Sequence, residues 1–138
     1  MKKAQFSSDL DQLHPMIEWI VAQISSLDFD ASAVRKIELA SEEAIVNIVR
    51  HAYKTRPGKI GLEVHLFPSH VEIVFLDNGP PFNPLIEGKK VNVKASLEER
   101  EEGGLGIFMI RKSMDDVRYE RKNDENKLIL VKKIRKNS

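Results

Sequence analysis

The chain has 138 residues, and its 22 lysines and arginines nearly balance its 21 aspartates and glutamates, for a formal net charge of +1. The length is that of one domain, and the charge balance does not demand a general nucleic-acid-binding surface. The chain contains no cysteine, which excludes disulfides and thiolate metal sites. It has no apolar run near the ~20 residues of a membrane span and no apolar stretch typical of a signal peptide. These features indicate a soluble cytoplasmic domain without a nucleic-acid or membrane partner.

Two helices are expected in the first part of the chain. Apolar residues that recur at steps of three and four predict a helix over residues 8–27, which Ser8 or Asp9 could cap. The same spacing predicts a second helix over residues 32–51. The Arg-Pro-Gly sequence at 56–58 ends this helical region.

Alternating apolar residues predict four strands in the second part, arranged as two hairpins. They are residues 59–67 with 71–77, and residues 116–122 with 127–134, the latter pair joined by the polar sequence "NDEN". Between the hairpins we expect an irregular segment over residues 79–104 and a helix over 105–114. This order predicts an α+β fold: a two-layer α/β sandwich in which helices cover one face of a mostly antiparallel sheet. We expect one domain over residues 1–138.

Three glycines, Gly103, Gly104 and Gly106, stand at the start of the last predicted helix. Unpaired N–H groups at a helix N-terminus suit an anion, and glycines let the backbone approach a phosphate closely. A tight packing turn explains such a cluster equally simply, and by itself more often. No Lys-Ser or Lys-Thr pair directly follows Gly106, so the segment is not a Walker A loop.

The second predicted helix carries polar residues inside an apolar run. Glu43 and Asn47 are four residues apart and therefore share one helical face, with His51 one further turn along. A carboxylate and a carboxamide at this spacing could hold Mg²⁺ and its waters beside a phosphate. A solvated polar stripe is the alternative, but it explains Asn47 poorly because the amide is costly to bury.

The sequence "FLDNGPPF", residues 75–82, ends a hydrophobic strand with an acid and a glycine. The carboxylate of Asp77 could accept a hydrogen bond from an exocyclic amine such as that of adenine, and Gly79 could let the chain pass close to a purine ring. A simple strand-ending turn is the alternative. The Asp-Asn-Gly sequence at 77–79 alone does not decide between the two interpretations.

Taken together and in this order, "EEAIVNIVRHAY", "DNGPPF" and "GGLGIFMIRKSMDDVRYE" resemble the GHKL ATPase superfamily. Its Bergerat fold is shared by histidine kinases, gyrase, Hsp90 and MutL. The details of the three segments are most similar to the small anti-sigma factor serine kinases of bacteria. The resemblance extends over about residues 8–134.

The resemblance implies specific roles for residues that match the family's motifs. Glu43 corresponds to the general base, Asn47 to the Mg²⁺ ligand and Asp77 to the acid that binds adenine. Residues 83–104 correspond to a lid over ATP. The residues that would bind the nucleotide are Asn47, Asp77, Gly79, Phe82, Gly103, Gly104, Leu105, Gly106 and Ile107.

The function implied is that of an ATP- and Mg²⁺-dependent serine protein kinase that acts as an anti-sigma factor. Such kinases phosphorylate a small antagonist protein, whose unphosphorylated form frees a sigma factor, and they often form homodimers. Two alternatives stay open at this point. One is a nucleotide-binding switch that sequesters a partner with little phosphotransfer. The other, less favoured, is an isolated histidine-kinase catalytic domain, because no helix with a phosphoacceptor histidine precedes the domain.

The sequence also departs from the family at two places. Some relatives have an arginine directly before the glycine turn, whereas this chain has Glu101 and Glu102, with Arg100 as the nearest cation. Pro81 stands where many members of the superfamily have a second glycine, which should stiffen that turn.

Overall fold

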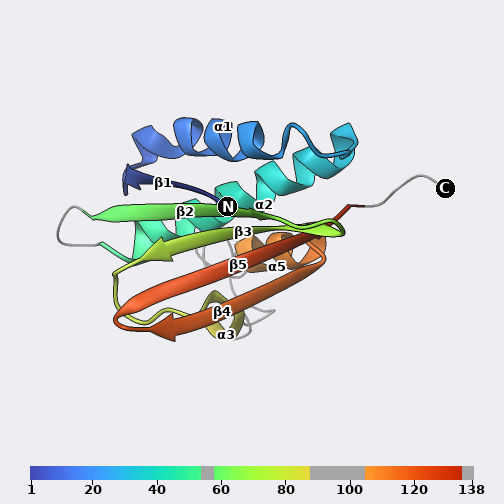
Figure 1. Cartoon of the computed structure of the whole chain (residues 1–138). Helices are drawn as coiled ribbons and strands as arrows, with labels where there is room; N and C mark the ends of the chain where they lie inside the picture. Colours follow the sequence, from blue (N-terminus) through green and yellow to red (C-terminus); the bar gives the residue numbers. More distant parts are fainter. Residues whose placement is uncertain (54–57, 88–104, 135–138) are drawn as a thin grey trace.

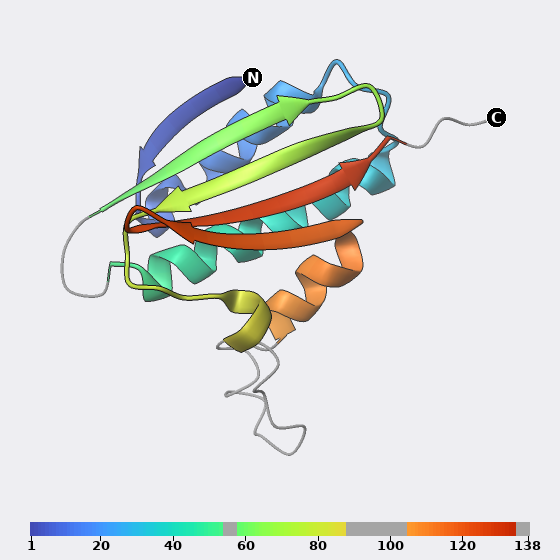
Figure 2. The same cartoon turned by 60° about the horizontal axis from the view of Figure 1, so that its bottom comes forward.

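The computed structural model describes residues 1–53, 58–87 and 105–134. In this part of the chain a five-stranded sheet packs against helices on one face, as Figures 1 and 2 show from two directions. The architecture is α+β, and the predicted two-layer arrangement is confirmed. None of the helices within the described residues combines the length and apolar character needed to span a bilayer.

The sheet has the order β1-β2-β3-β5-β4, and every neighbouring pair is antiparallel. Its strands are β1 (Lys2–Ser7), β2 (Lys59–Leu66), β3 (His70–Asp77), β4 (Asp116–Lys122) and β5 (Glu125–Lys133). The central strand β3 pairs with β2 on one side and with β5 on the other. The register of the second pair sets Asp77, the last residue of β3, opposite Asn126, near the start of β5. Two polar residues from distant parts of the sequence therefore meet at one end of the sheet.

The edge strand β1 was not predicted from the sequence. Its residues are mostly exposed, with only Ala4 and Phe6 partly covered, so their alternation of apolar side chains is weak. The strand forms because its backbone pairs with β2, from Lys2 opposite Val64 to Ser7 opposite Lys59. Pairing over such a distance in sequence leaves little local signal.

The hairpin turn between β4 and β5 is shorter than the predicted polar sequence 123–126. Asn123 and Asp124 have positive φ angles of 54° and 61°, as in the two-residue turns whose twist matches that of antiparallel strands. Glu125 and Asn126 therefore belong to β5 and not to the turn. This correction places Asn126 on the sheet, where it becomes part of the candidate site.

The helices are η1 (Leu10–Gln12, a 3-10 turn), α1 (Leu13–Ile24), α2 (Ala31–His51), α3 (Pro84–Glu87) and α5 (Leu105–Ser113). The first predicted helix is thus divided into η1 and α1. Asp9 caps η1, because its carboxylate accepts a hydrogen bond from the backbone N–H of Asp11 at 2.9 Å. Asp30 caps α2 by accepting from the N–H of Ala33 at 2.7 Å.

The hydrophobic core lies between the helices and the inner face of the sheet. Strand residues at alternate positions point inward, and α1, α2 and α5 cover them. Its largest fully buried side chains include Phe75 from β3, Met16 from α1, Ile45 from α2 and Ile110 from α5. A second, small cluster of Val74, Ile129 and Val131 lies on the other face. The long helix α2 crosses the inner face and brings its C-terminal end toward the end of β3.

Ser41 gives a test of this packing. It is fully buried on α2, and its hydroxyl has no hydrogen-bond partner among the described residues. A buried hydroxyl without a partner is unfavourable, and alanine is the better helix former. We predict that Ser41→Ala raises the free energy of unfolding by up to about 1 kcal/mol in urea titrations.

The matched control is Ser32→Ala on the exposed side of the same helix, which should change stability by less than about 0.5 kcal/mol. Destabilisation by Ser41→Ala of more than about 1 kcal/mol would contradict the assignment, since it would show that the hydroxyl is hydrogen-bonded in the folded protein.

Candidate functional site

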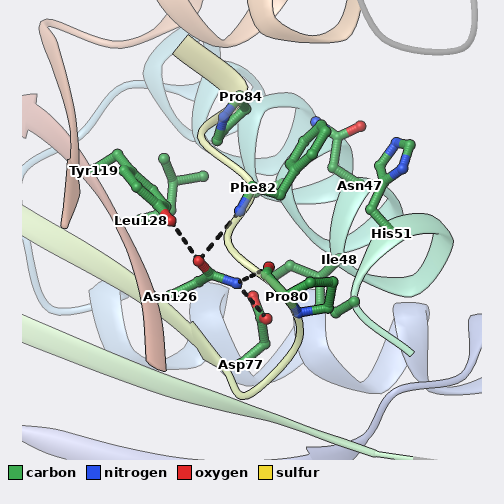
Figure 3. A pocket seen from close by; sticks show the side chains of 12 residues that line it. Asn47, Ile48, His51, Asp77, Pro80, Phe82, Pro84, Tyr119, Asn126 and Leu128 are labelled. Atoms are coloured by element: carbon green, nitrogen blue, oxygen red, sulfur yellow. Dashed lines mark hydrogen bonds between the residues drawn. The ribbon is translucent and has the colours of Figure 1, made fainter. Parts of the chain in front are cut away.

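A cavity lies where the end of β3, the start of β5 and the C-terminal half of α2 meet (Figure 3). Its walls are mostly apolar, and its polar groups come from five side chains that converge on it. The lining residues are Ala44, Asn47, Ile48, His51, Ala52, Asp77, Pro80, Phe82, Pro84, Tyr119, Asn126 and Leu128. An apolar cavity with a few placed polar groups is the usual form of a small-molecule site.

The side-chain amide of Asn126 is the centre of the polar contacts in this cavity. Its nitrogen donates to Oδ1 of Asp77 and to the carbonyl oxygen of Pro80, both at 2.9 Å. Its oxygen accepts from the hydroxyl of Tyr119 and, at 3.4 Å, from the backbone N–H of Phe82. Figure 3 shows these four interactions as dashed lines around one amide.

The segment 78–82, which links β3 to α3, is held by further side chains. The hydroxyl of Tyr53 accepts from the N–H of Asn78 and donates to the carbonyl of Lys59, both at 2.8 Å. A guanidinium nitrogen of Arg121 donates to the carbonyl of Gly79 at 2.7 Å. The two prolines of the segment have no N–H to satisfy. Side chains from three other parts of the chain thus bind the backbone of this irregular segment.

Asp77 ends β3 with its carboxylate buried at the cavity. Its Oδ1 atom accepts two hydrogen bonds, from the backbone N–H of Gly79 and from the amide of Asn126, both at 2.9 Å. No hydrogen bond from the described residues is recorded at the other oxygen, Oδ2. This geometry orients the carboxylate and leaves one acceptor for a ligand that donates.

Gly79 packs directly against the C-terminal end of α2. A Cβ atom at this position would lie 2.5 Å from Cα and 2.6 Å from Cβ of Ala52, closer than such atoms can approach. Only glycine therefore fits between the segment 78–82 and the helix. This contact explains Gly79 by packing, and the predicted approach to a purine ring stays a prediction.

Glu43 and Asn47 lie on α2, one turn apart, but in different surroundings. Asn47 is buried and lines the cavity together with His51, one turn further on. Glu43 is half-buried and is not part of the cavity wall. Burial raises the pKa of the Glu43 carboxyl above its ordinary value of 4.5, the charge of Glu42 raises it further, and the charge of Arg50 partly opposes both. The raised pKa makes Glu43 a stronger base than an ordinary glutamate.

The donor set at this place is compatible with Mg²⁺. No group of three or more histidines, aspartates and glutamates that could hold a metal ion occurs in the described ranges. Mg²⁺ does not need such a group, because it commonly keeps water ligands and binds one or two protein oxygens together with substrate phosphates. The carboxamide oxygen of Asn47 fits that mode, with a nucleotide supplying the remaining ligands.

Phe82 forms the wall opposite the amide network. Its ring stacks on the imidazole of His51, with 4.4 Å between the ring centroids and 14° between the planes. The stack joins the segment 78–82 to α2 from the other side of the cavity. The predicted cofactor-binding residues Asn47, Asp77 and Phe82 thus lie around one cavity.

The glycine-rich segment can be placed only in part. Gly103, Gly104 and most of the predicted lid, residues 88–104, lie outside the described residues. Leu105, Gly106 and Ile107 form the first turn of α5, as predicted for the end of that segment. Arg111 on α5 reaches α3, since its guanidinium donates to the carbonyl of Leu85 at 3.5 Å.

Sequence reasoning missed three side chains of the site: Asn126, Tyr119 and Tyr53. The polar sequence predicts a turn at Asn126, although this residue stands two positions before Leu128 and thus shares the inward-facing register of β5. Tyr119 has the inward register of β4, opposite Leu128. A polar residue in the buried register of a strand is the signal that could have identified Asn126 and Tyr119. Tyr53 follows the end of α2 and carries no such signal.

Comparisons with known proteins show the family and the fold. Residues 6–132 match the model of the histidine kinase-like ATPase domain. A serine-protein kinase RsbW of Bacillus mycoides is 33% identical over 110 residues, which cover 78% of this chain and 68% of that protein. RsbW of Bacillus thuringiensis is 32% identical over the same length.

Solved structures show the same fold. The nucleotide-free catalytic domain of histidine kinase ThkA superposes with a TM-score of 0.58 at 15% sequence identity, covering 97% of this chain and 98% of that one. Histidine kinase AdeS of Acinetobacter baumannii gives a TM-score of 0.52 at 10% identity, covering 99% of this chain and 70% of that one. The chain belongs to the histidine kinase-like ATPase domain family and is a relative of the RsbW serine-protein kinases.

Proposed function

We propose that this protein is an ATP-dependent serine protein kinase that acts as an anti-sigma factor and phosphorylates a small antagonist protein. The observation that carries the proposal is the oriented carboxylate of Asp77 in an apolar cavity beside Asn47. The RsbW relatives, which are named serine-protein kinases, favour serine as the acceptor. The histidine kinase structures are less than 25% identical and support the fold alone.

The adenine ring of ATP would occupy the cavity. Apolar side chains such as Ile48 and Leu128 would contact its faces, and Phe82 would close one side. The free Oδ2 atom of Asp77 would accept a hydrogen bond from the exocyclic amine. The apolar walls supply binding energy, whereas the carboxylate selects the base.

The triphosphate would extend from the cavity along α2 toward Asn47 and the first turn of α5. Bound Mg²⁺ would neutralise phosphate charge as transfer proceeds. The carboxamide of Asn47 would bind this ion, and backbone N–H groups at the start of α5 would bind phosphate oxygens. Phosphoryl transfer depends mainly on positioning and on charge neutralisation, so these groups suffice for most of the chemistry.

Glu43 would accept the proton of the attacking serine hydroxyl. It lies one helical turn from Asn47 and is only half-buried, so an incoming serine could reach it. Its raised pKa suits this task, because a general base works best when its pKa lies close to the working pH while it is still ionised.

The partners would be the antagonist protein and a sigma factor that the kinase holds until the unphosphorylated antagonist displaces it. A homodimer stays a prediction from the family resemblance. The direct test is incubation with labelled ATP, Mg²⁺ and candidate antagonist proteins from the same genome. Label on a serine of one antagonist supports the proposal. Binding of the antagonist without transfer would instead indicate a sequestering switch.

We predict that Asp77→Asn weakens ATP binding by roughly 10- to 150-fold, which corresponds to about 1.5–3 kcal/mol for a hydrogen bond to a charged group. Isothermal calorimetry measures the effect, and circular dichroism should show an intact fold. GTP should compete poorly with ATP for binding to the wild-type protein, because its ring presents a carbonyl where adenine has an amine. Equal affinity of wild type and variant for ATP would sink the assignment of Asp77.

We predict that Glu43→Gln keeps ATP bound and slows phosphotransfer by roughly 10²–10⁴-fold. The rate of the wild-type protein should fall as the pH drops through the raised pKa of Glu43, because only the ionised carboxylate accepts a proton. The variant should lose this dependence. Glu42→Gln, one residue away and exposed, is the matched control and should keep most of the rate.

The raised pKa of Glu43 also affects how the free energy of unfolding changes with pH. The folded-state pKa of Glu43 is higher than its ordinary 4.5, so the fold favours the protonated form. The contribution of Glu43 to stability is therefore lost as the pH rises from 4.5 through the raised pKa. Glu43→Gln should not lower the free energy of unfolding at neutral pH.

If the Glu43→Gln variant transfers phosphate at the wild-type rate, Glu43 is not the general base.

A further inference from the structure

The amide of Asn126 uses its full hydrogen-bonding capacity inside the protein. A carboxamide has two N–H donors and an oxygen with two acceptor sites. The donors engage Asp77 and the carbonyl of Pro80, and the oxygen engages Tyr119 and the N–H of Phe82. Asn126 lines the cavity, yet it has no group left with which to bind a ligand. Its influence on a ligand must pass through its neighbours.

The four neighbours also fix which way the amide points. Turning it over would set its oxygen against Oδ1 of Asp77 and the carbonyl of Pro80, and its N–H groups against the N–H of Phe82. Tyr119 supports the observed orientation by donating its hydroxyl proton to the amide oxygen. Burial raises the pKa of the Tyr119 hydroxyl, against the opposing effects of the Phe82 N–H and Arg121, so the hydroxyl stays protonated and remains a donor.

The fixed amide in turn fixes the carboxylate of Asp77. With Oδ1 held by the amide and by the N–H of Gly79, the carboxylate cannot rotate without losing both hydrogen bonds. The remaining atom, Oδ2, offers only an acceptor. A ring with an amino group at this edge fits, whereas a ring with a carbonyl sets oxygen against oxygen and leaves both unpaired. Leaving a buried polar group unpaired costs free energy, and this cost makes the site discriminate against the ring with the carbonyl.

We infer that Asn126 and Tyr119 are positioning residues that set the selectivity of this site for 6-aminopurine over 6-oxopurine nucleotides by holding the Asp77 carboxylate in one orientation. The inference rests on the proposed binding of ATP in this cavity. It adds two residues that would act on the base through Asp77, and it assigns them an effect on the ratio of affinities and not on affinity alone.

The experiment compares ATP with inosine triphosphate, which carries a carbonyl in place of the 6-amino group, by isothermal calorimetry. The wild-type protein should bind ATP at least about tenfold more tightly. Tyr119→Phe should lower this ratio by about threefold or more, because the amide loses one of the contacts that fix it. Asn126→Ala should lower it further, toward equal affinity, because Oδ1 of Asp77 then loses a donor.

Tyr53→Phe is the matched control. It also removes one phenolic oxygen that binds the segment 78–82, but this oxygen binds the N–H of Asn78 and does not reach Asp77. Tyr53→Phe should weaken the binding of both nucleotides by the same factor and leave the ratio of their affinities unchanged. A merely structural role of Tyr119 would give the same result as the control.

The outcomes separate this inference from the proposed function. If the ratio of ATP to inosine triphosphate affinity in both Tyr119→Phe and Asn126→Ala stays within about twofold of the wild-type ratio, the inference is overturned. The proposed binding of ATP would not be affected by that result. Should Asn126→Ala not fold, the ratio measured for Tyr119→Phe decides by itself. A wild-type protein that binds neither nucleotide overturns the proposed function, and the inference with it. A ratio that falls in Tyr119→Phe and not in Tyr53→Phe supports it.

Discussion

The side-chain amide of Asn126 joins three parts of the molecule, two of which lie more than 40 residues away from it in the sequence. It binds the end of β3 through Asp77, the segment 78–82 through the backbone of Pro80 and Phe82, and β4 through Tyr119. This segment belongs to no helix or strand, so its backbone groups cannot be satisfied by a ladder of hydrogen bonds. Side chains perform that function instead, and the shape of the cavity depends on them.

The energetic consequence is asymmetric. Each of these hydrogen bonds contributes only about 1 kcal/mol net, because water would bind the same groups in the unfolded chain. Removing one partner costs about 1–3 kcal/mol, because the other is left buried and unpaired. Packing adds a second constraint at Gly79, where contact with Ala52 leaves no space for a side chain. The stack of Phe82 on His51 ties the same segment to α2. Hydrogen bonds from the sheet and ring contacts from the helix thus hold both sides of the cavity.

The predictable part of the site lies where local sequence determines geometry. Helical spacing alone sets Glu43 and Asn47 on one face of α2, and the end of a hydrophobic strand alone places Asp77 at an edge of the core. The α+β architecture follows from three helical patterns and two hairpins. The unpredictable part depends on pairing between distant segments. Strand β1 forms through its partner β2 and has little hydrophobic alternation of its own.

Asn126 shows the same limit at a single residue. In the sequence it reads as the end of a polar turn, and only the positive φ angles of Asn123 and Asp124 shift it into β5. Its meeting with Asp77 then depends on the register between β3 and β5, which spans 49 residues of chain. No local pattern contains that information. The family resemblance predicts which residues would touch the nucleotide, whereas the residues that hold Asp77 in place are visible only in the folded chain.

Hydrogen exchange of the backbone amides in the nucleotide-free protein tests the central claim, that the segment 78–82 is fully formed before a ligand binds. The N–H groups of Asn78, Gly79 and Phe82 each donate to a side chain in the structure. We expect all three amides to exchange slowly without nucleotide, at rates closer to those of amides in β3 than to those of an exposed turn. Exchange of these three amides at the rate of an unstructured peptide, with protection appearing only when ATP is added, would contradict it.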